Sequence, residues 1–455
     1  MVATAGALAA TAPARAPARP MPTDPDVAII GAGSAGIAAA RRLMAAGRSV
    51  VVIEAADRIG GRAFTESATF GVPYDHGCAW LQGPRDLPHM AVARDLGFAV
   101  VDHANAGEAF FIDGARADRS EQARLDRTTA AIHAAAARAG DVSVASVIPQ
   151  DLPRSAEAQT WLANAYAVDM ADCSTADMAA YGDYEVDCLI REGLGALVAH
   201  LGRDLPVKLG AAARVVDWSG QGVRVETTAG TVAARACVVT VSTGVLGSGA
   251  IRFKPDLPPA QAQAAADVPM GLLTKIALQF DGARFGLREN DWLSYALPPE
   301  IPARACYFVT FPAGLDLAVG FVGGAFAWDL AAAGADAAID FALGEFVGAV
   351  GSEARRHFVK GHMTDWHANP LTLGAYAAAR PGRHAARAAL AAPLGDRVFF
   401  AGEALAVPLA ALCSGAHLSG EAAADAALAA LAAREGCGGC DARGRQLRRL
   451  GGADE

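Results

Sequence analysis

Cysteines, basic residues and long apolar runs are all scarce in this chain. The eight cysteines among 455 residues are too few and too scattered for a disulfide scaffold, which favours a reducing cytoplasm, with the periplasm left open as the alternative. The 39 basic residues are outnumbered by 48 acidic ones, so no nucleic-acid partner bound through its phosphates is expected. No apolar run reaches the roughly 18 residues that a membrane-spanning helix needs, so no membrane span is expected.

The remaining composition is that of a large folded protein. Hydrophobic residues make up 53% and charged residues 19%, which supports an extensive core and excludes wholesale disorder. A length of 455 residues corresponds to two or three domains. The Ala- and Pro-rich residues 1–25 are predicted to be a flexible leader, and residues 436–455 a flexible tail. The pair Cys437 and Cys440 in that tail has no second pair nearby, so no metal site is expected.

A glycine-rich turn joins the first predicted strand, residues 26–30, to a helix over residues 37–46. Its G-x-G-x-x-G pattern consists of Gly31, Ala32, Gly33, Ser34, Ala35 and Gly36. Gly31 permits the tight turn, Gly33 lets the backbone approach a pyrophosphate, and Gly36 lets the helix pack on the strand. The backbone of Ser34 and Ala35 is expected to face the phosphates. Glu54 follows the second strand, where an acid accepts hydrogen bonds from ribose hydroxyls, so we favour a dinucleotide site over a plain glycine turn.

The residues after Glu54 indicate which dinucleotide binds. Gly60, Gly61 and Arg62 resemble the E-x-x-x-x-x-G-G-R run of flavoproteins, in which the glycines approach the FAD diphosphate and the arginine supports it. With the blocks described below, the chain resembles the flavin-containing amine oxidase family. The resemblance implies FAD as cofactor and an α/β fold: a Rossmann-type FAD-binding domain interleaved with an α+β substrate domain.

Residues 74–83 resemble the family segment that passes beside the isoalloxazine, which implies contacts from Ala79 and Trp80. Gln82 stands where plant polyamine oxidases carry an acidic residue near the amine. Because a neutral amide holds a polycation poorly, Gln82 argues against spermine-like substrates. His76 is interpreted as a side chain satisfied by local hydrogen bonds rather than as a catalytic base.

Two central blocks continue the resemblance. Val215, in a predicted hairpin of residues 213–218 and 223–227, matches the position whose backbone holds the adenine in the family. Lys275 lies in an alternating strand and could be a surface lysine with a buried stem. The resemblance instead implies a catalytic role, in which Lys275 holds a water at flavin N5, the atom that takes the hydride.

Two aromatic residues resemble the family's substrate pocket. Trp366 and Tyr376 match the W-x-x-x-P and G-[ST]-Y positions that line the cavity facing the flavin. Ala375 stands where mammalian monoamine oxidases carry the cysteine bonded to FAD, so non-covalent FAD is expected. Leu412 takes the place of a second cage tyrosine, which puts a two-aromatic sandwich in doubt.

The last block matches the family's closing F-A-G-E and G-A-x-x-S-G signatures. Gly402 and Glu403 follow a predicted strand, and Glu403 would meet the ribityl chain. Gly415 and Ala416 begin a helix whose positive end faces the flavin pyrimidine and stabilises reduced anionic flavin. His417 is interpreted as a packed histidine.

The order of these blocks predicts two interleaved domains. The FAD-binding domain would collect residues 26–79, 190–252 and 380–435, and the substrate domain residues 80–189 and 253–379, including helices over 121–140 and 156–170. The ligand would sit at their interface.

The resemblance implies oxidation of a small or aromatic amine. Hydride passes from the amine α-carbon to flavin N5, water hydrolyses the imine, and O2 reoxidises the flavin to give hydrogen peroxide. The alternatives are an L-amino-acid oxidase, a C–C desaturase of a lipid-like substrate, and a catalytically silent FAD-binding subunit. The expected partners are therefore a small-molecule amine and O2, with the oligomeric state, including a homodimer, left open.

Overall fold

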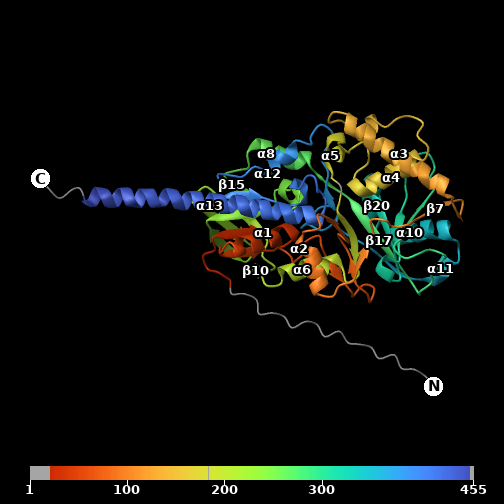
Figure 1. Ribbon diagram of the computed structural model, residues 1–455, viewed down its shortest axis with the longest axis horizontal. Helices are drawn as coiled ribbons and strands as arrows, with labels where there is room; N and C mark the ends of the chain where they lie inside the picture. The colour runs from red at the N-terminus through yellow and green to blue at the C-terminus, as the bar shows by residue number, and fades with distance from the viewer. Residues whose placement is uncertain (1–20, 183, 451–455) are drawn as a thin grey trace, which may run out of the picture.

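One half of the molecule is built on a parallel sheet whose strands come from distant stretches of the chain. The computed structural model describes residues 21–182 and 184–450, with side chains up to residue 435 (Figure 1). The order of the sheet is β10 (Val207–Lys208), β2 (Val50–Ile53), β1 (Val27–Ile30), β14 (Ala236–Val239) and β23 (Val398–Phe400). All neighbours are parallel, and the residues of β1, β2 and β14 are buried throughout. The predicted α/β class with a Rossmann-type sheet is confirmed.

Helices α1 (Ser34–Ala45) and α13 (Cys413–Leu450) lie side by side on this sheet (Figure 1). A Cβ on Gly36 would lie 1.9 Å from the carbonyl oxygen of Gly31, and one on Gly420 would lie 2.1 Å from that of Ala35. Only glycine permits backbones to approach this closely. The predicted helix after the glycine turn is therefore confirmed, and it begins at Ser34.

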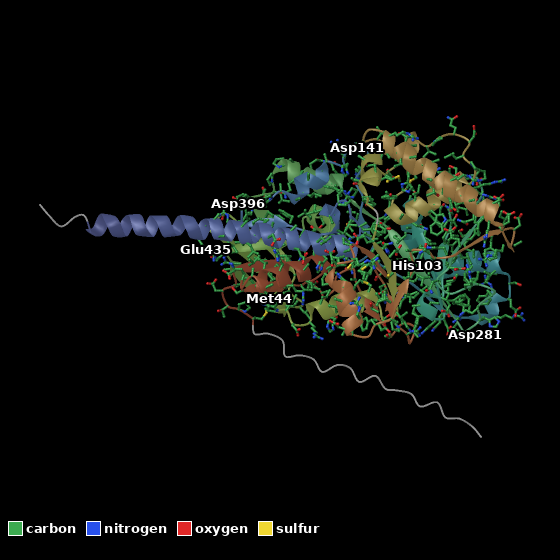
Figure 2. All side chains as sticks on the ribbon, in the orientation of Figure 1. Met44, His103, Asp141, Asp281, Asp396 and Glu435 are labelled. Carbon is green, nitrogen blue, oxygen red and sulfur yellow. The ribbon has the colours of Figure 1, made fainter. Side chains whose placement is uncertain are left out.

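Helix α13 continues past residue 435. Its backbone is helical to Leu450, so the tail predicted from residue 436 starts within the helix, and its flexibility stays a prediction. Residues 441–450 include several Arg and Leu residues, which favour helix, and no proline. Figure 2 shows Glu435 where α13 leaves the body, and its carboxylate accepts hydrogen bonds from Arg48 and Arg235. Residues 1–20 of the predicted leader lie outside the described residues, as do the side chains of Cys437 and Cys440.

A second, four-stranded sheet packs behind the parallel sheet through a shared apolar core. Its order is β13 (Gly230–Ala234), β12 (Val223–Thr227), β11 (Ala213–Asp217) and β15 (Arg252–Lys254). The antiparallel pairing of β11 and β12 confirms the predicted hairpin.

The other half of the molecule is built on a seven-stranded sheet (Figure 1). Its order is β21 (Phe358–Met363), β17 (Leu273–Phe280), β20 (Leu317–Gly323), β19 (Tyr307–Thr310), β18 (Trp292–Tyr295), β7 (Glu108–Ile112) and β8 (Ala115–Arg116). Helices α9 (Ala325–Ala333) and α10 (Ala335–Val350) bury apolar faces against it. A separate helical group comprises α3 (Arg119–Arg138), α4 (Ser155–Tyr166) and α5 (Thr175–Ala180), close to two predicted helices.

Shorter elements join the two halves. A three-stranded sheet has the order β5 (Trp80–Gly83), β9 (Val186–Ile190) and β6 (Val100–Asp102). Two small pairs are β3 (Thr65–Glu66) with β4 (Tyr74–Asp75), and β16 (Met270–Gly271) with β22 (Tyr376–Ala377). The remaining helices are α2 (Pro88–Asp95), α6 (Leu194–Gly202), α7 (Thr243–Gly247), α8 (Pro259–Asp267), α11 (Ala354–His357) and α12 (Ala386–Ala391), with short 3-10 turns at Val144–Ser146, Pro312–Gly314 and Glu403–Leu405.

A buried ion pair ties the helical group to the C-terminal part of the chain. The guanidinium of Arg387 on α12 donates to both carboxylate oxygens of Asp177 on α5, at 2.7 and 2.6 Å, and to the carbonyl oxygen of Ala404. Both side chains are almost fully buried. Burial opposes ionisation of Asp177, but the hydrogen bonds from Arg387 outweigh it and lower the pKa of Asp177.

Replacing Asp177 by Asn is expected to destabilise the protein strongly, because it leaves the Arg387 charge buried without its partner. We expect a loss of about 3 kcal/mol in unfolding free energy. Asp425→Asn is the matched control, since Asp425 pairs with Arg42 where both side chains are half exposed. Thermal and urea unfolding measure the difference, and equal effects of the two variants would contradict this role.

The stability difference between the Asp177→Asn variant and the unmodified protein should depend on pH in one direction. The lowered pKa of Asp177 means that its contribution is complete above the pKa of an unfolded aspartate, near 3.9. The contribution disappears as the pH falls through the lower pKa of the folded state. The gap between the Asp177→Asn variant and the unmodified protein should therefore close in acid.

Candidate functional site

A cavity of about 1240 Å³ runs between the two halves of the molecule. Most site residues predicted from the sequence line it, although they come from distant stretches of the chain. They are Gly31, Gly33, Ser34, Ala35, Glu54, Gly60, Gly61, Arg62, Ala79, Trp80, Gln82, Lys275, Trp366, Tyr376, Gly402, Glu403, Leu412 and Ala416.

Three predicted residues do not line the cavity. Gly36 and Gly415 lie behind its wall, where a Cβ on either would lie 1.9 Å from a carbonyl oxygen. Val215 lies within β11, paired to β12 on one side and to β15 on the other. The register shifts between Ala213 and Val215, so Ala212, Ala213 and Arg214 form the cavity wall instead. Val215 itself does not line the cavity, and the role of its backbone at the adenine stays a prediction.

One end of the cavity is a cradle of backbone atoms. Gly33 and Gly60 pair in an isolated bridge, and a Cβ on Gly61 would lie 3.2 Å from the Cα of Gly33. Both Gly60 and Gly61 have positive φ angles, 102° and 59°, which favour glycine. No side chain caps the first turn of α1, so its N–H groups remain available to an anion. This geometry fits a diphosphate.

Glu54 lies beside the cradle, at the end of β2. Its carboxylate accepts the backbone N–H of Ala32 at 2.7 Å and that of Ala56 at 2.8 Å. Each carboxylate oxygen can accept a further hydrogen bond, so Glu54 retains acceptors for ribose hydroxyls on its cavity side.

Arg62 and Glu403 cross-link two walls of the cavity. Nη1 of Arg62 donates to Oε1 of Glu403 and to the carbonyl oxygen of Ala375, each at 2.8 Å. Glu403 also accepts the backbone N–H of Ala377 at 3.1 Å. The ion pair therefore joins the turn after β2 to the turn after β23, and both side chains also bond to the backbone at β22.

Lys275 is one of only four lysines in the chain and is buried on β17. Its Nζ donates to the carbonyl oxygen of Asp75 at 3.1 Å and to that of Gly77. Burial lowers the pKa of Lys275, against the attraction of the nearby Asp75 carboxylate. Burial raises the pKa of Asp75, whose carboxylate accepts the N–H groups of Leu194 and Gly195. Lys275 is thus held against the segment that leads into β5.

The predicted pocket aromatics are each anchored by one hydrogen bond. Trp366 Nε1 donates to the carbonyl oxygen of His76 at 2.9 Å, and the Tyr376 hydroxyl donates to that of Asn164 at 2.6 Å. Burial raises the pKa of Tyr376, so the phenol stays neutral. The His76 ring bonds to Glu66 at 2.9 Å, which confirms its interpretation as a locally satisfied side chain.

An aromatic wall was not found from the sequence. Trp292 on β18 stacks on Trp80, with ring centroids 5.6 Å apart, and the edge of Trp161 on α4 meets Trp292 at 4.9 Å. Phe321 on β20 packs against Trp80 at 5.5 Å. All four line the cavity. No motif marks the added three, because they converge from separate elements.

A polar group beside this wall was also missed. Gln82 on β5 lies directly opposite Asp187 on β9, and the N–H of His103 donates to the backbone oxygen of Asp187 at 2.8 Å. Trp80 Nε1 donates to His103 Nδ1 at 3.2 Å, so the proton of the neutral ring is on Nε2. Figure 2 shows His103 in the half that holds the seven-stranded sheet. Within the described residues, Oδ1 of Asp187 and Nε2 of His103 have no hydrogen-bond partner, although both residues line the cavity.

Burial raises the pKa of Asp187, and the neighbouring amide of Gln82 opposes that effect. Among the described residues there is no cluster of His, Cys, Asp and Glu suited to a metal ion. In the same part of the chain, no helix is long and apolar enough to cross a membrane.

Comparison with known proteins agrees with this geometry. A polyamine oxidase 4 of Oryza sativa subsp. japonica is 27% identical over 439 residues, 88% of each chain. A probable polyamine oxidase 4 of Arabidopsis thaliana is 28% identical over 442 residues, 87% of this chain and 85% of its own. A putrescine oxidase structure with bound putrescine shares the fold, with a TM-score of 0.73 and 23% identity over 89% of this chain and 99% of that one. The family model for flavin containing amine oxidoreductases matches residues 34–139 and 156–428, and the chain belongs to this family.

Proposed function

We propose that the protein is an FAD-dependent amine oxidase acting on a small or aromatic amine. The observation that carries the proposal is the buried Lys275. Its Nζ lies 5.9 Å from the ring centroids of Trp80 and Phe321, in the cavity that the diphosphate cradle also lines. Burying a lysine ammonium among apolar side chains costs folding free energy. Buried ionisable groups of this kind are common at functional sites. Bound FAD would supply the chemistry by accepting a hydride from the carbon next to the amine nitrogen.

The residues of the cavity fit non-covalent FAD. Gly33, the first turn of α1, and Gly60 with Gly61 would hold the diphosphate, and Glu54 the ribose. The stretch 212–214 would lie against the adenine. Ala375 offers no thiol for a covalent bond to the flavin.

The chain's own residues would prepare the amine. Trp80, Trp161 and Trp292 exclude water and present flat apolar faces to an aromatic or aliphatic side chain. Lys275 Nζ, fixed by two carbonyl oxygens, keeps a third proton for a water or an amine in the cavity.

A diamine is the second candidate. Oδ1 of Asp187 lies without a partner at the cavity wall, next to the neutral Gln82, and could accept a hydrogen bond from a distal ammonium. An amino-acid substrate is less well supported, because the arginines that line the described cavity belong to its FAD end. Arg62 pairs with Glu403, Arg58 donates to Gly61, and Arg214 lies on β11.

A substrate screen tests the activity. We expect the yellow holoprotein to be bleached anaerobically by an arylalkylamine and to release hydrogen peroxide in air. A flavin that no amine, diamine or amino acid bleaches would contradict the proposal and support the silent FAD-binding subunit.

Asp187→Asn separates the two substrate classes in the same assay. If a diamine is the substrate, the variant should lose about tenfold in kcat/KM for it, the scale of one charged hydrogen bond, and keep its rate with an arylalkylamine. Asp102→Asn on the exposed side of β6 is the matched control. If kcat/KM for the diamine is unchanged in Asp187→Asn, Asp187 does not bind a distal ammonium and the diamine proposal is wrong.

Lys275→Met is expected to slow anaerobic flavin reduction on the order of 100-fold, because the one ionisable side chain of β17 is lost. Lys360→Met is the control, since Lys360 lies exposed on the neighbouring strand β21. Stopped-flow reduction measures the rate, and FAD content is checked by absorbance. Reduction of a fully loaded Lys275→Met variant at the unmodified rate would contradict the role of Lys275.

Acid precipitation should release the entire flavin into the supernatant, as expected of a non-covalent cofactor. Glu403→Gln keeps the size of the side chain but weakens its hold on Arg62, so FAD affinity should fall about tenfold, or about 1.4 kcal/mol. Glu353→Gln, on an exposed glutamate, is the control. Fluorescence titration of the apoprotein measures both, and flavin that stays with the precipitate would refute non-covalent binding.

A further inference from the structure

Two cysteines line the cavity and pack against the same two groups of buried apolar residues. Cys78 belongs to the segment leading into β5, and Cys413 is the first residue of α13. The approach of the two elements is close, since a Cβ on Gly83 of β5 would lie 2.9 Å from Oγ of Ser414. The start of α13 is further fixed by Ser34, whose Oγ donates to the carbonyl oxygen of Cys413 at 2.9 Å.

These two thiols differ from the other cysteines whose side chains the structure describes. Cys173, Cys188, Cys237 and Cys306 are buried and do not line the cavity. Cys78 and Cys413 are partly exposed, and the space that exposes them is the cavity. Both cysteines therefore border the space that a small molecule in the cavity would enter.

The surroundings shift the pKa values of the two cysteines in opposite directions. A hydrogen bond from the Cys78 thiol lowers the pKa of Cys413 well below its usual range, and the neighbouring His89 and Ser34 contribute in the same direction. The same interaction raises the pKa of Cys78, with burial adding to it.

The other charged groups around the pair are accounted for. Asp75 raises the pKa of Cys78, whereas Lys275 lowers it. His417 on α13 touches His89, with ring centroids 4.8 Å apart, and burial lowers the pKa of His417 to about 3, so it stays neutral. A cysteine of lowered pKa near a second thiol favours reversible disulfide formation.

We propose that Cys78 and Cys413 form a reversible disulfide site for hydrogen peroxide at the wall of the cavity. The Cys413 thiolate attacks one peroxide oxygen, the O–O bond breaks, and the departing hydroxide takes a proton to become water. The Cys78 sulfur then gives up its proton and attacks the sulfur of the Cys413 sulfenic acid, whose S–O bond breaks to release a second water. Two thiols are oxidised to one disulfide, and one peroxide is reduced to two waters.

The site has a direct connection to the reacting end of the cavity. The residue before Cys78 is Gly77, whose carbonyl oxygen accepts a hydrogen bond from Lys275 Nζ. The disulfide would covalently join this segment to the start of α13. The proposed amine oxidation would supply peroxide in the same cavity, so the inference rests on the proposed function for its oxidant in the cell, but not for its test.

Peroxide added without any amine tests the site on the FAD-loaded full-length chain. The background carries Cys437→Ser and Cys440→Ser, so that the C-x-x-C pair does not contribute. We expect peptide mapping to show a Cys78–Cys413 link with the loss of two hydrogen atoms, and dithiothreitol to restore both thiols. Thiols that both survive peroxide, or Cys413 oxidised without a link, would overturn the proposal.

Single variants identify the attacking sulfur. In Cys78→Ser, dimedone should trap a sulfenic acid on Cys413, whereas in Cys413→Ser no label should appear on Cys78. Cys188→Ser is the matched control and should form the link as the background protein does. Labelling of Cys78 in Cys413→Ser would overturn the assigned roles. Because no amine is present, a failed link and a failed amine oxidation are separate results.

Discussion

Backbone contact at two glycines determines where both cavity-facing helices begin. Gly36 brings α1 against the turn at Gly31, and Gly420 brings α13 against the backbone of α1 at Ala35. The two helices therefore start next to one another, where Ser34 is hydrogen-bonded to Cys413. Two helix N-termini at one wall create a positive region that suits a diphosphate and an anionic flavin, and it also favours a thiolate. The diphosphate cradle and the proposed disulfide site both depend on this packing of the two helices.

Charges around the cavity are buried in pairs rather than singly. Arg62 is paired with Glu403, and Arg387 with Asp177, and both pairs also bond to the backbone around β22. Lys275 differs, because its ammonium bonds to carbonyl oxygens and faces a carboxylate that is already occupied by N–H groups. The two ion pairs fix the walls of the cavity relative to one another. Lys275, which has no ion-pair partner in direct contact, can still donate a hydrogen bond into the cavity.

What the sequence could predict was mainly local or carried by ordered motifs. The glycine turn, Glu54 and the Gly-Gly-Arg run lie within one stretch, and their geometry follows from strand, turn and helix. Ala212, Ala213 and Arg214 line the cavity beside a bulge in β11, and a bulge has no clear mark in one sequence. Trp161 and Trp292 were missed because α4 and β18 meet only through tertiary packing.

The most important residue that the sequence did not reveal is an acidic one beside Gln82, at the cavity wall. The neutral Gln82 argued against a polycation, but a strand position shares its face with the residue opposite it on the next strand. That residue is Asp187, so an acidic group stands beside the neutral position after all. Burial favours its protonated form, and an arriving ammonium would favour the carboxylate. For the proposed oxidase, a diamine would therefore need an ionised Asp187 as the partner of its distal ammonium, whereas an aromatic amine would not.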